Sequence, residues 1–267
     1  MSIEYESEKE ENSLSTLRVS SLYKSFGKKT VVRGIDFSMT NGEVLGLLGP
    51  NGSGKTTTFY MIVGFYKPTA GEVFMNDQCI TSLPMYKRAL LGISYLPQEP
   101  SVFRKLTVEE NIWAILETRK DLTKSEKKKR LEELIEEFAI GRIRKQQAYT
   151  LSGGERRRTE IARSLAIEPK FLLLDEPVAN LDFGYQKELL DLMKRLSQEQ
   201  NMGICATIHD INTAAFYADT LVLLPKLSPS IMGTVDEVLT PENLQKAYGV
   251  NVQLYEHPVY KVKQVCL

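Results

Sequence analysis

The eight residues that most strongly predict the fold are Gly49-Pro50-Asn51-Gly52-Ser53-Gly54-Lys55-Thr56. They fit the pattern G-x-x-x-x-G-K-[ST], follow the apolar run from Val44 to Leu48 and precede a helical segment that continues from Thr57. A glycine-rich loop between a strand and a helix presents backbone N–H groups and the positive end of the helix dipole to phosphate oxygens. Lys55 is then expected to reach the β- and γ-phosphates of a nucleotide, and Thr56 to bind the Mg²⁺ that bridges them.

The composition is ordinary for a soluble globular protein: 42% of the 267 residues are hydrophobic and 25% are charged. Basic and acidic residues number 34 each, so no broad electrostatic surface for nucleic acid or membrane is expected. The sequence shows neither a membrane span nor a signal peptide, which predicts a cytoplasmic chain without direct membrane insertion. Cys79, Cys205 and Cys266 lack metal-ligand spacing and are predicted to be structural thiols.

Three parts of the chain are expected. Residues 1–15 are predicted to form a flexible tail, residues 16–225 a nucleotide-binding α/β domain and residues 226–267 a C-terminal segment. Alternating apolar and polar residues at 17–39 predict an antiparallel β-subdomain. The run from Leu221 to Leu224 is read as the last strand.

An α-helical subdomain is predicted as an insert at about residues 99–165. Thr107 and Thr123 each open a capping box and are followed by apolar residues at helical spacing. The basic run at 127–130 lies among glutamates, which favours a solvated helix face over a nucleic-acid patch.

Two carboxylates follow the apolar run from Phe171 to Leu174, which is typical of a parallel strand buried on both faces. Asp175 is placed to hold Mg²⁺, and Glu176 to polarise a water molecule for in-line attack on the γ-phosphorus. His209 follows another apolar run and is expected at the same sheet edge. Its imidazole either donates a hydrogen bond to the γ-phosphate or is simply a satisfied core or surface histidine.

Three further positions carry open alternatives. Ser152 and Glu155 form another capping box around two glycines predicted to be exposed, Gly153 and Gly154, which indicates either a second anion-binding helix end or only a capped helix. Gln98 lies between two prolines and either reaches a metal ion or water through its amide or is a solvated loop residue. Phe26 either stacks on an adenine base or belongs to the core.

In this order, the motifs resemble those of the ATP-binding cassette family over about residues 17–255. The loop at 49–56 is similar to the family's phosphate loop, Gln98 to its Q-loop, residues 151–155 to its LSGGE signature and residues 172–176 to the motif with the catalytic glutamate. Asn180-Leu181-Asp182 resembles the family's D-loop. His209 resembles the switch histidine, and Phe26 resembles the aromatic residue that stacks on adenine. The resemblance implies a head-to-tail homodimer that holds ATP between the phosphate loop of one subunit and the signature of the other.

The resemblance also assigns a role to each candidate site residue. The catalytic candidates are Glu176, His209 and Gln98, the metal ligands are Thr56, Gln98 and Asp175, and Asp182 belongs to the dimer contact. The ATP-binding candidates are Phe26, Gly49, Pro50, Asn51, Gly52, Ser53, Gly54, Lys55, Thr56, Thr57, Ser152, Gly153, Gly154 and Glu155.

The likeness within the family divides along the chain. Residues 46–60, 95–107 and 151–158 resemble the ATPases of lipopolysaccharide exporters, whereas residues 208–219 and 238–249 resemble those of iron-chelate or metal-ion importers. A natural intermediate and a fusion of two homologues both fit this division. The helical insert and the Q-loop receive the membrane subunit in this family. The resemblance therefore implies an ATPase for lipopolysaccharide export, with an importer ATPase as the alternative.

Two expectations concern partners and the C-terminal segment. The absence of a membrane span in the sequence implies separate integral membrane permease subunits and a peripheral position on the cytoplasmic face of the inner or plasma membrane. A repair or chromosome-associated cassette ATPase is disfavoured because the interval before the signature is too short for a coiled coil or zinc modules. Pro225 and Pro229 replace a hairpin common in relatives and predict an irregular segment, and Val178 is not the residue expected there.

Overall fold

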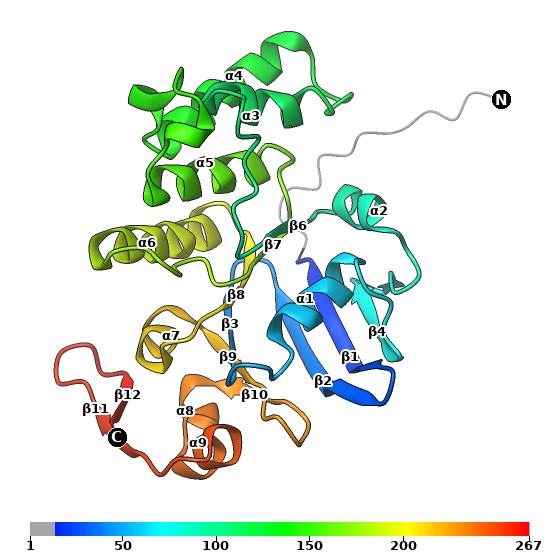
Figure 1. Ribbon diagram of the computed structural model, residues 1–267, viewed down its shortest axis with the longest axis vertical. Helices are drawn as coiled ribbons and strands as arrows, with labels where there is room; N and C mark the ends of the chain where they lie inside the picture. The colour runs from blue at the N-terminus through cyan, green and yellow to red at the C-terminus, as the bar shows by residue number, and fades with distance from the viewer. Residues whose placement is uncertain (1–13, 267) are drawn as a thin grey trace.

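The computed structural model describes residues 14–266 (Figure 1). Most of the predicted tail, residues 1–15, lies outside the described residues, but Ser15 is already buried and donates its backbone N–H to Asn41 Oδ1 at 2.6 Å. None of the helices within residues 14–266 has the length and hydrophobicity needed to cross a bilayer.

The antiparallel β-subdomain is a four-stranded sheet in the order β2-β1-β4-β5, which confirms the prediction from residues 17–39. Its strands are β1 (Thr16–Phe26), β2 (Lys29–Thr40), β4 (Ala70–Met75) and β5 (Gln78–Cys79). Alternate residues of β1, such as Leu17 and Val19, are buried, so one face of the sheet packs on the core.

The central sheet has six strands in the order β10-β9-β3-β8-β7-β6. They are β3 (Val44–Leu48), β6 (Ile93–Leu96), β7 (Phe171–Leu174), β8 (Gly203–Thr207), β9 (Thr220–Leu223) and β10 (Ile231–Thr234). The first five in chain order pair in parallel, and β3, β7 and β8 are buried along their whole lengths. This confirms the α/β class that the apolar runs predicted. Strands of a parallel sheet are apolar throughout because helices cover both faces of the sheet.

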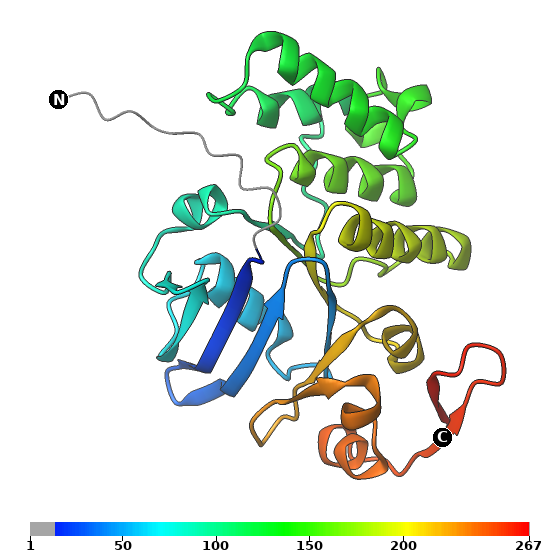
Figure 2. The ribbon, with the colours of Figure 1, turned by 180° about the vertical axis from the view of Figure 1, so that it is seen from behind.

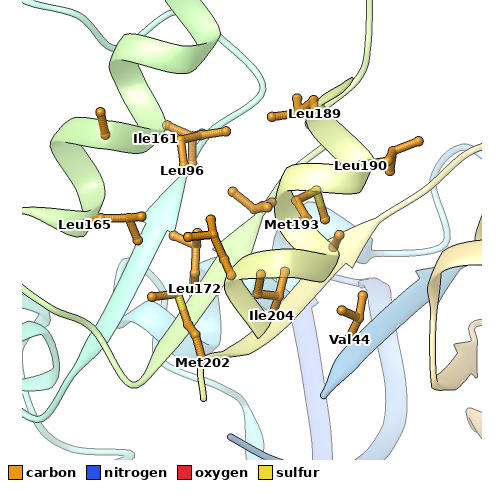
Figure 3. Close-up of a cluster of buried hydrophobic side chains, with 14 of the residues drawn as sticks. Val44, Leu96, Ile161, Leu165, Leu172, Leu189, Leu190, Met193, Met202 and Ile204 are labelled. Atoms are coloured by element: carbon orange, nitrogen blue, oxygen red, sulfur yellow. The ribbon is translucent and has the colours of Figure 1, made fainter. Parts of the chain in front are cut away.

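Helices from different parts of the chain cover the central sheet. These are α1 (Lys55–Val63), α2 (Met85–Leu90), α6 (Phe183–Glu199), α7 (Ile211–Tyr217), α8 (Val235–Val238) and α9 (Pro241–Tyr248). Figure 3 shows Leu172 and Ile204 of the sheet beside Met193 of α6, and all three are buried. The helices therefore pack on the central strands of the sheet, and the loops that follow β3, β7 and β8 begin at the ends of these covered strands.

The α-helical subdomain lies at one end of the molecule, as both ribbon views show (Figures 1 and 2). It contains α3 (Val108–Leu116), α4 (Lys124–Glu137), α5 (Gly153–Leu165) and the 3₁₀ turns η1 (Gly141–Ile143) and η2 (Ala148–Thr150). The predicted capping boxes at Thr107 and Thr123 are both formed. The prediction of a helical insert is thus confirmed in kind.

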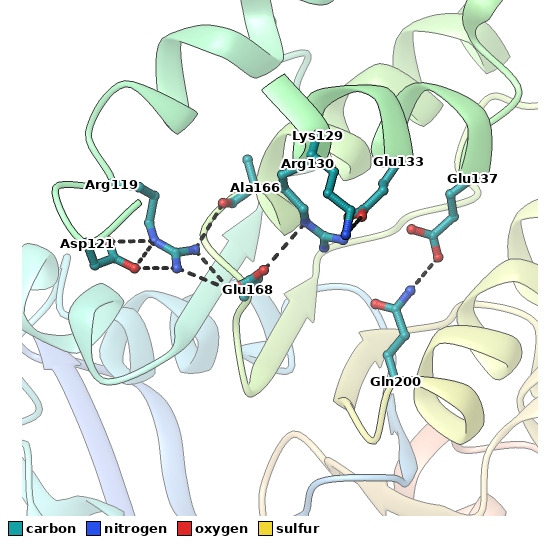
Figure 4. Close-up of polar contacts among 9 residues, drawn as sticks. All are labelled: Arg119, Asp121, Lys129, Arg130, Glu133, Glu137, Ala166, Glu168 and Gln200. Atoms are coloured by element: carbon teal, nitrogen blue, oxygen red, sulfur yellow. Dashed lines mark hydrogen bonds and ion pairs between the residues drawn. The ribbon is translucent and has the colours of Figure 1, made fainter. Parts of the chain in front are cut away.

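Polar contacts join this subdomain to the loop that enters the central sheet (Figure 4). Glu168, between α5 and β7, accepts from Arg119 at 3.1 Å and pairs with Arg130 at 3.7 Å. Gln200, which follows α6, donates to Glu137 at the end of α4. These side chains tie the helical subdomain to the two segments that lead into β7 and β8.

The C-terminal segment is regular, so the expectation of an irregular chain was wrong. Pro225 and Pro229 lie in the loop between β9 and β10, and the two strands pair antiparallel on either side of it. Neither proline therefore occupies a ladder position. The strand β9 is also not the last: after α9, β11 (Gln253–Glu256) and β12 (Lys263–Cys266) form a further hairpin.

Candidate nucleotide site

The phosphate loop connects β3 to α1, as its sequence predicts, and residue 54 caps the helix. Gly54 has φ 97°, a left-handed conformation that favours glycine, and a Cβ there would lie 2.8 Å from Val32. Gly52 faces open space, since nothing lies within 4 Å of a Cβ built on it. The loop therefore leaves its backbone open to an incoming group.

The polar side chains of the loop are poised for an anion. Lys55 is only 7% exposed, and its ammonium donates to the carbonyl oxygens of Gly49 at 2.7 Å and Pro50 at 3.4 Å. The hydroxyl of Ser53 is buried without a hydrogen-bond partner. A buried hydroxyl without a partner costs stability unless a ligand satisfies it, so the loop fits a phosphate group.

The predicted carboxylates lie at the end of β7 and share a partner on the neighbouring strand. Thr207, the last residue of β8, donates its hydroxyl to Asp175 Oδ1 at 2.9 Å and accepts from the backbone N–H of Glu176 at 2.6 Å. Glu176 has φ 47°, a strained conformation for a residue with a Cβ. Thr207 was missed because its sequence context gives no sign that β8 lies beside β7.

Two of the predicted site residues, Gln98 and His209, contact a third, Glu176. Gln98 Nε2 donates to Glu176 Oε2 at 2.6 Å, and His209 Nε2 lies 2.6 Å from Glu176 Oε1. The side chain of Glu176 is 17% exposed, so the cluster is reachable from solvent. His209 is 45% exposed, so the core reading of its side chain is wrong, whereas Gln98 is an exposed loop residue whose amide reaches Glu176.

Electrostatics connect the phosphate loop to the carboxylates. Burial lowers the pKa of Lys55, and the charges of Glu176 and Asp175 act in the opposite direction. Burial also raises the pKa of Tyr95, helped by the neighbouring charge of Asp175, so this phenol keeps its proton. The charge of Lys55 in the phosphate loop and the charges of the two carboxylates therefore influence one another.

A buried arginine, which sequence reasoning missed, ties three of these segments together. Arg157 of α5 donates to the carbonyl oxygens of Pro97 at 2.9 Å, Pro177 at 3.1 Å and Asp175 at 3.3 Å, and pairs with Glu160 at 3.3 Å. Burial lowers its pKa. The signal available in the sequence was a pair of opposite charges three residues apart on the apolar face of a predicted helix.

The partner of this arginine holds the segment after Gln98. Glu160 is 2% exposed and accepts from the backbone N–H groups of Ser101 at 2.6 Å and Val102 at 3.3 Å. Arg163, one turn further along α5, donates to the carbonyl oxygen of Ser101 at 2.7 Å. Helix α5 therefore holds both ends of the loop from Pro97 to Val102.

The signature segment differs in one respect from its prediction. Ser152 and Glu155 form the expected capping box, with Glu155 Oε2 accepting the backbone N–H of Ser152 at 2.9 Å. Gly153 is exposed, but Gly154 is buried, because the ring of Tyr185 lies 2.6 Å from the position of a Cβ. The expectation of two exposed glycines was therefore wrong for Gly154.

Two candidates lie outside the cluster around Glu176. Asp182 is exposed and caps α6 by accepting the N–H of Tyr185 at 3.1 Å. Phe26 is the last residue of β1 and is 45% exposed. Its ring packs edge to face with the ring of Tyr66, with the two centroids 5.4 Å apart. The core reading of Phe26 is therefore wrong, and the ammonium of Lys24 lies over its ring, 5.1 Å from the centroid.

The family model described as ABC transporter matches residues 32–179, more than half of the chain. The chain belongs to the ABC transporter family. This family assignment confirms the resemblance seen in the motifs, and with it an ATP-hydrolysing, nucleotide-binding function.

Known relatives of this ABC ATPase cover nearly its whole length. The "Lipopolysaccharide export system ATP-binding protein LptB" of Haemophilus influenzae is 42% identical over 237 residues, which is 88% of this chain and 97% of the relative. A chain from a transporter classed as metal-chelate type, in an inward-facing conformation, has a TM-score of 0.79 and 25% identity, covering 95% of this chain and 98% of its own. A dimeric cassette in a post-hydrolysis state, bound to ADP and Pi, has a TM-score of 0.72 and 25% identity, covering 82% and 98%.

The donor set of this ABC ATPase also fits Mg²⁺. The hydroxyl of Thr56, the amide oxygen of Gln98 and the carboxylate of Asp175 are the hard oxygen ligands that Mg²⁺ prefers. Within the described part of the chain, no three His, Cys, Asp or Glu side chains are grouped to hold a metal by themselves. A site with few protein carboxylates is typical of an Mg²⁺ that takes other ligands from the phosphates of its nucleotide.

The C-terminal part of this ABC ATPase also reaches the phosphate loop. Tyr248, at the end of α9, interacts through its hydroxyl with the backbone of Gly49, and burial raises its pKa to about 12. Its position could not be read from the sequence, because about two hundred residues separate it from the loop.

Proposed function

We propose that the chain is the ATP-hydrolysing subunit of a transporter that exports lipopolysaccharide. The observation that carries this proposal is its 42% identity, over 97% of the relative's length, to a protein named for lipopolysaccharide export. The match is long enough to include the Q-loop at Gln98 and the helical subdomain, which together receive the membrane subunit in the family. An importer ATPase is the second candidate, favoured by the structural likeness to a metal-chelate type transporter.

The proposed reaction is hydrolysis of ATP to ADP and inorganic phosphate. The phosphate loop and Lys55 bind the phosphates. Glu176 takes a proton from a water molecule while the oxygen of that water attacks the γ-phosphorus, and the bond between the γ-phosphorus and ADP breaks. Gln98 and His209 contact the two oxygens of the Glu176 carboxylate. When ATP is bound, His209 would donate a hydrogen bond to the γ-phosphate. Mg²⁺, held by Thr56, Gln98 and Asp175, would neutralise charge on the β- and γ-phosphates.

The proposed assembly is a head-to-tail homodimer. In the described residues, no hydrogen bond or ion pair connects the signature, Ser152 to Glu155, with the phosphate loop of the same chain. The exposed, capped helix end at Gly153 is therefore free to meet the nucleotide of a second subunit, with Asp182 and Phe26 near the contact. The structural relative that is a dimer bound to ADP and Pi supports a dimer.

The proposed partner is an integral membrane permease whose cytoplasmic helix enters an apolar groove. The groove has a volume of about 570 Å³ and is lined by residues of α1, the turn after it, α2 and β6, among them Tyr60, Phe65, Met85 and Tyr95. Pro97, next to Gln98, also lines it. Docking there would place the chain peripherally on the cytoplasmic face of the membrane.

Replacing Lys55 with alanine is expected to weaken ATP binding about tenfold to a hundredfold. The reason is that a hydrogen bond to a charged group contributes about 1.5–3 kcal/mol. Isothermal titration calorimetry measures the affinity. Lys128→Ala, on the exposed face of α4, is the matched control and should bind ATP like the wild type. Unchanged affinity in Lys55→Ala would contradict the phosphate-loop assignment.

Affinity capture tests the transported class. The Glu176→Gln protein, with ATP and Mg²⁺, is used to recover integral proteins from native membranes, and permeases of a lipopolysaccharide exporter are expected. Recovery of an iron-chelate importer permease would favour the second candidate instead. Recovery of no membrane protein would contradict both transport proposals.

A further inference from the structure

One side chain spans the distance between the apolar groove and the proposed metal ligand. Tyr95, in β6, lines the groove, and its hydroxyl donates to Asp175 Oδ2 at 3.4 Å. The strands β6 and β7 are parallel neighbours, with Tyr95 opposite Leu173, so the residue reaches across to the end of β7. The same residue therefore contacts both a candidate docking surface and a candidate catalytic carboxylate.

The two oxygens of Asp175 are held from opposite sides. Thr207 on β8 donates to Oδ1 at 2.9 Å, and Tyr95 on β6 donates to Oδ2. Asp175 is only 1% exposed, so bulk water offers little replacement for either donor. Of the two hydrogen bonds, the one from Tyr95 comes from the side of the groove, and it is the longer one.

The ring of Tyr95 is packed so that changes in the groove reach it. It packs edge to face with the rings of Tyr60 and Phe65, with ring centroids 5.9 Å and 6.3 Å away. Both of these residues line the groove. Phe65 is 53% exposed, so an occupant of the groove would touch it directly. On the other side, Tyr95 meets Phe59, which is fully buried, at 6.2 Å. An occupant of the groove that touches Phe65 is therefore one ring contact away from Tyr95, whose ring is backed by the buried Phe59.

We propose that Tyr95 is a positioning residue that orients Asp175 for the metal and couples occupancy of the groove to the metal site. The coupling rests on the proposed function, because it needs a membrane partner in the groove. The orientation of Asp175 does not, since it requires only this chain, nucleotide and metal. The two parts are therefore tested separately.

Tyr95→Phe removes the hydroxyl and keeps the packed ring. Binding of a non-hydrolysable ATP analogue is measured by calorimetry in Mg²⁺ and in EDTA, and the ratio of the two affinities reports the metal. We expect this ratio to fall about tenfold in the variant, because loss of a group that orients a metal ligand costs about 10–100-fold. Affinity in EDTA should stay that of the wild type.

Tyr217→Phe is the matched control, because it deletes another tyrosine hydroxyl that donates to an aspartate, Asp191, at 2.9 Å on the α7 side of the molecule. Its affinity ratio should equal that of the wild type. A wild-type ratio in Tyr95→Phe would overturn the positioning role. An equal loss in Mg²⁺ and EDTA would overturn it as well, since the metal would then not be involved.

The coupling is tested on the complex with the permease recovered by affinity capture. The wild type is expected to hydrolyse ATP faster in the complex than alone. Because Tyr95 lines the groove, Tyr95→Phe is assayed with the permease at saturation, and it is expected to lose most of this stimulation even at saturating Mg²⁺. Full stimulation of the variant would refute the coupling. If the wild type itself recovers no permease, the proposed function fails, and the Mg²⁺ measurement on the isolated chain still decides the role of Tyr95.

Discussion

Replacement of Glu176 with glutamine is expected to lower ATP turnover by about a hundredfold to ten-thousandfold while ATP binding is retained. That is the contribution of a positioned general base, and glutamine keeps the size of the side chain but cannot accept the proton of the attacking water. The hydrogen bond from Gln98 and the contact with His209 place the carboxylate, so the loss should appear in kcat rather than in affinity.

Turnover is measured by phosphate release and affinity by calorimetry on the same preparation. With ATP and Mg²⁺, the variant should also accumulate as a dimer in size-exclusion chromatography, because hydrolysis is the step proposed to open it. Glu199→Gln, an exposed glutamate at the end of α6, is the control and should hydrolyse ATP at the wild-type rate. Wild-type turnover in Glu176→Gln would remove the role assigned to Glu176.

Replacement of Arg157 with methionine is expected to lower the free energy of unfolding by about 3–5 kcal/mol. The variant leaves Glu160 buried, at 2% exposure, without its cationic partner, and removal of one member of a buried ion pair has a cost of this size. It also removes the donors to the carbonyl oxygens of Pro97, Pro177 and Asp175.

Urea denaturation, followed by circular dichroism, measures this loss. Arg158→Met is the neighbouring control, because Arg158 pairs with the exposed Glu188 and a surface ion pair contributes only about 0–1 kcal/mol. A loss in Arg157→Met no larger than that of Arg158→Met would show that the buried network does not hold α5 against the central sheet.

Much of the site could be predicted from the sequence because its features are local. The phosphate loop, the capping boxes at Thr107, Thr123 and Ser152, and the carboxylates after Leu174 depend on residues within one turn or one strand end. In such segments, backbone geometry and residue type together determine the structure, and the ends of parallel strands necessarily meet at one sheet edge. That is why His209 was expected at the same sheet edge as Asp175 and Glu176.

The contacts that hold those residues were decided only by the tertiary structure. Thr207 and Tyr95 reach Asp175 from neighbouring strands that are 32 and 80 positions away in the chain. Burial of Gly154 under Tyr185 and the pairing of strands around Pro225 likewise depend on how distant segments pack. Periodicity and local motifs report which face of a segment is buried, but not which segment covers it. The chemical groups of this ABC ATPase are therefore legible in its sequence, whereas their partners follow from the strand order and from the packing of α5 and α6.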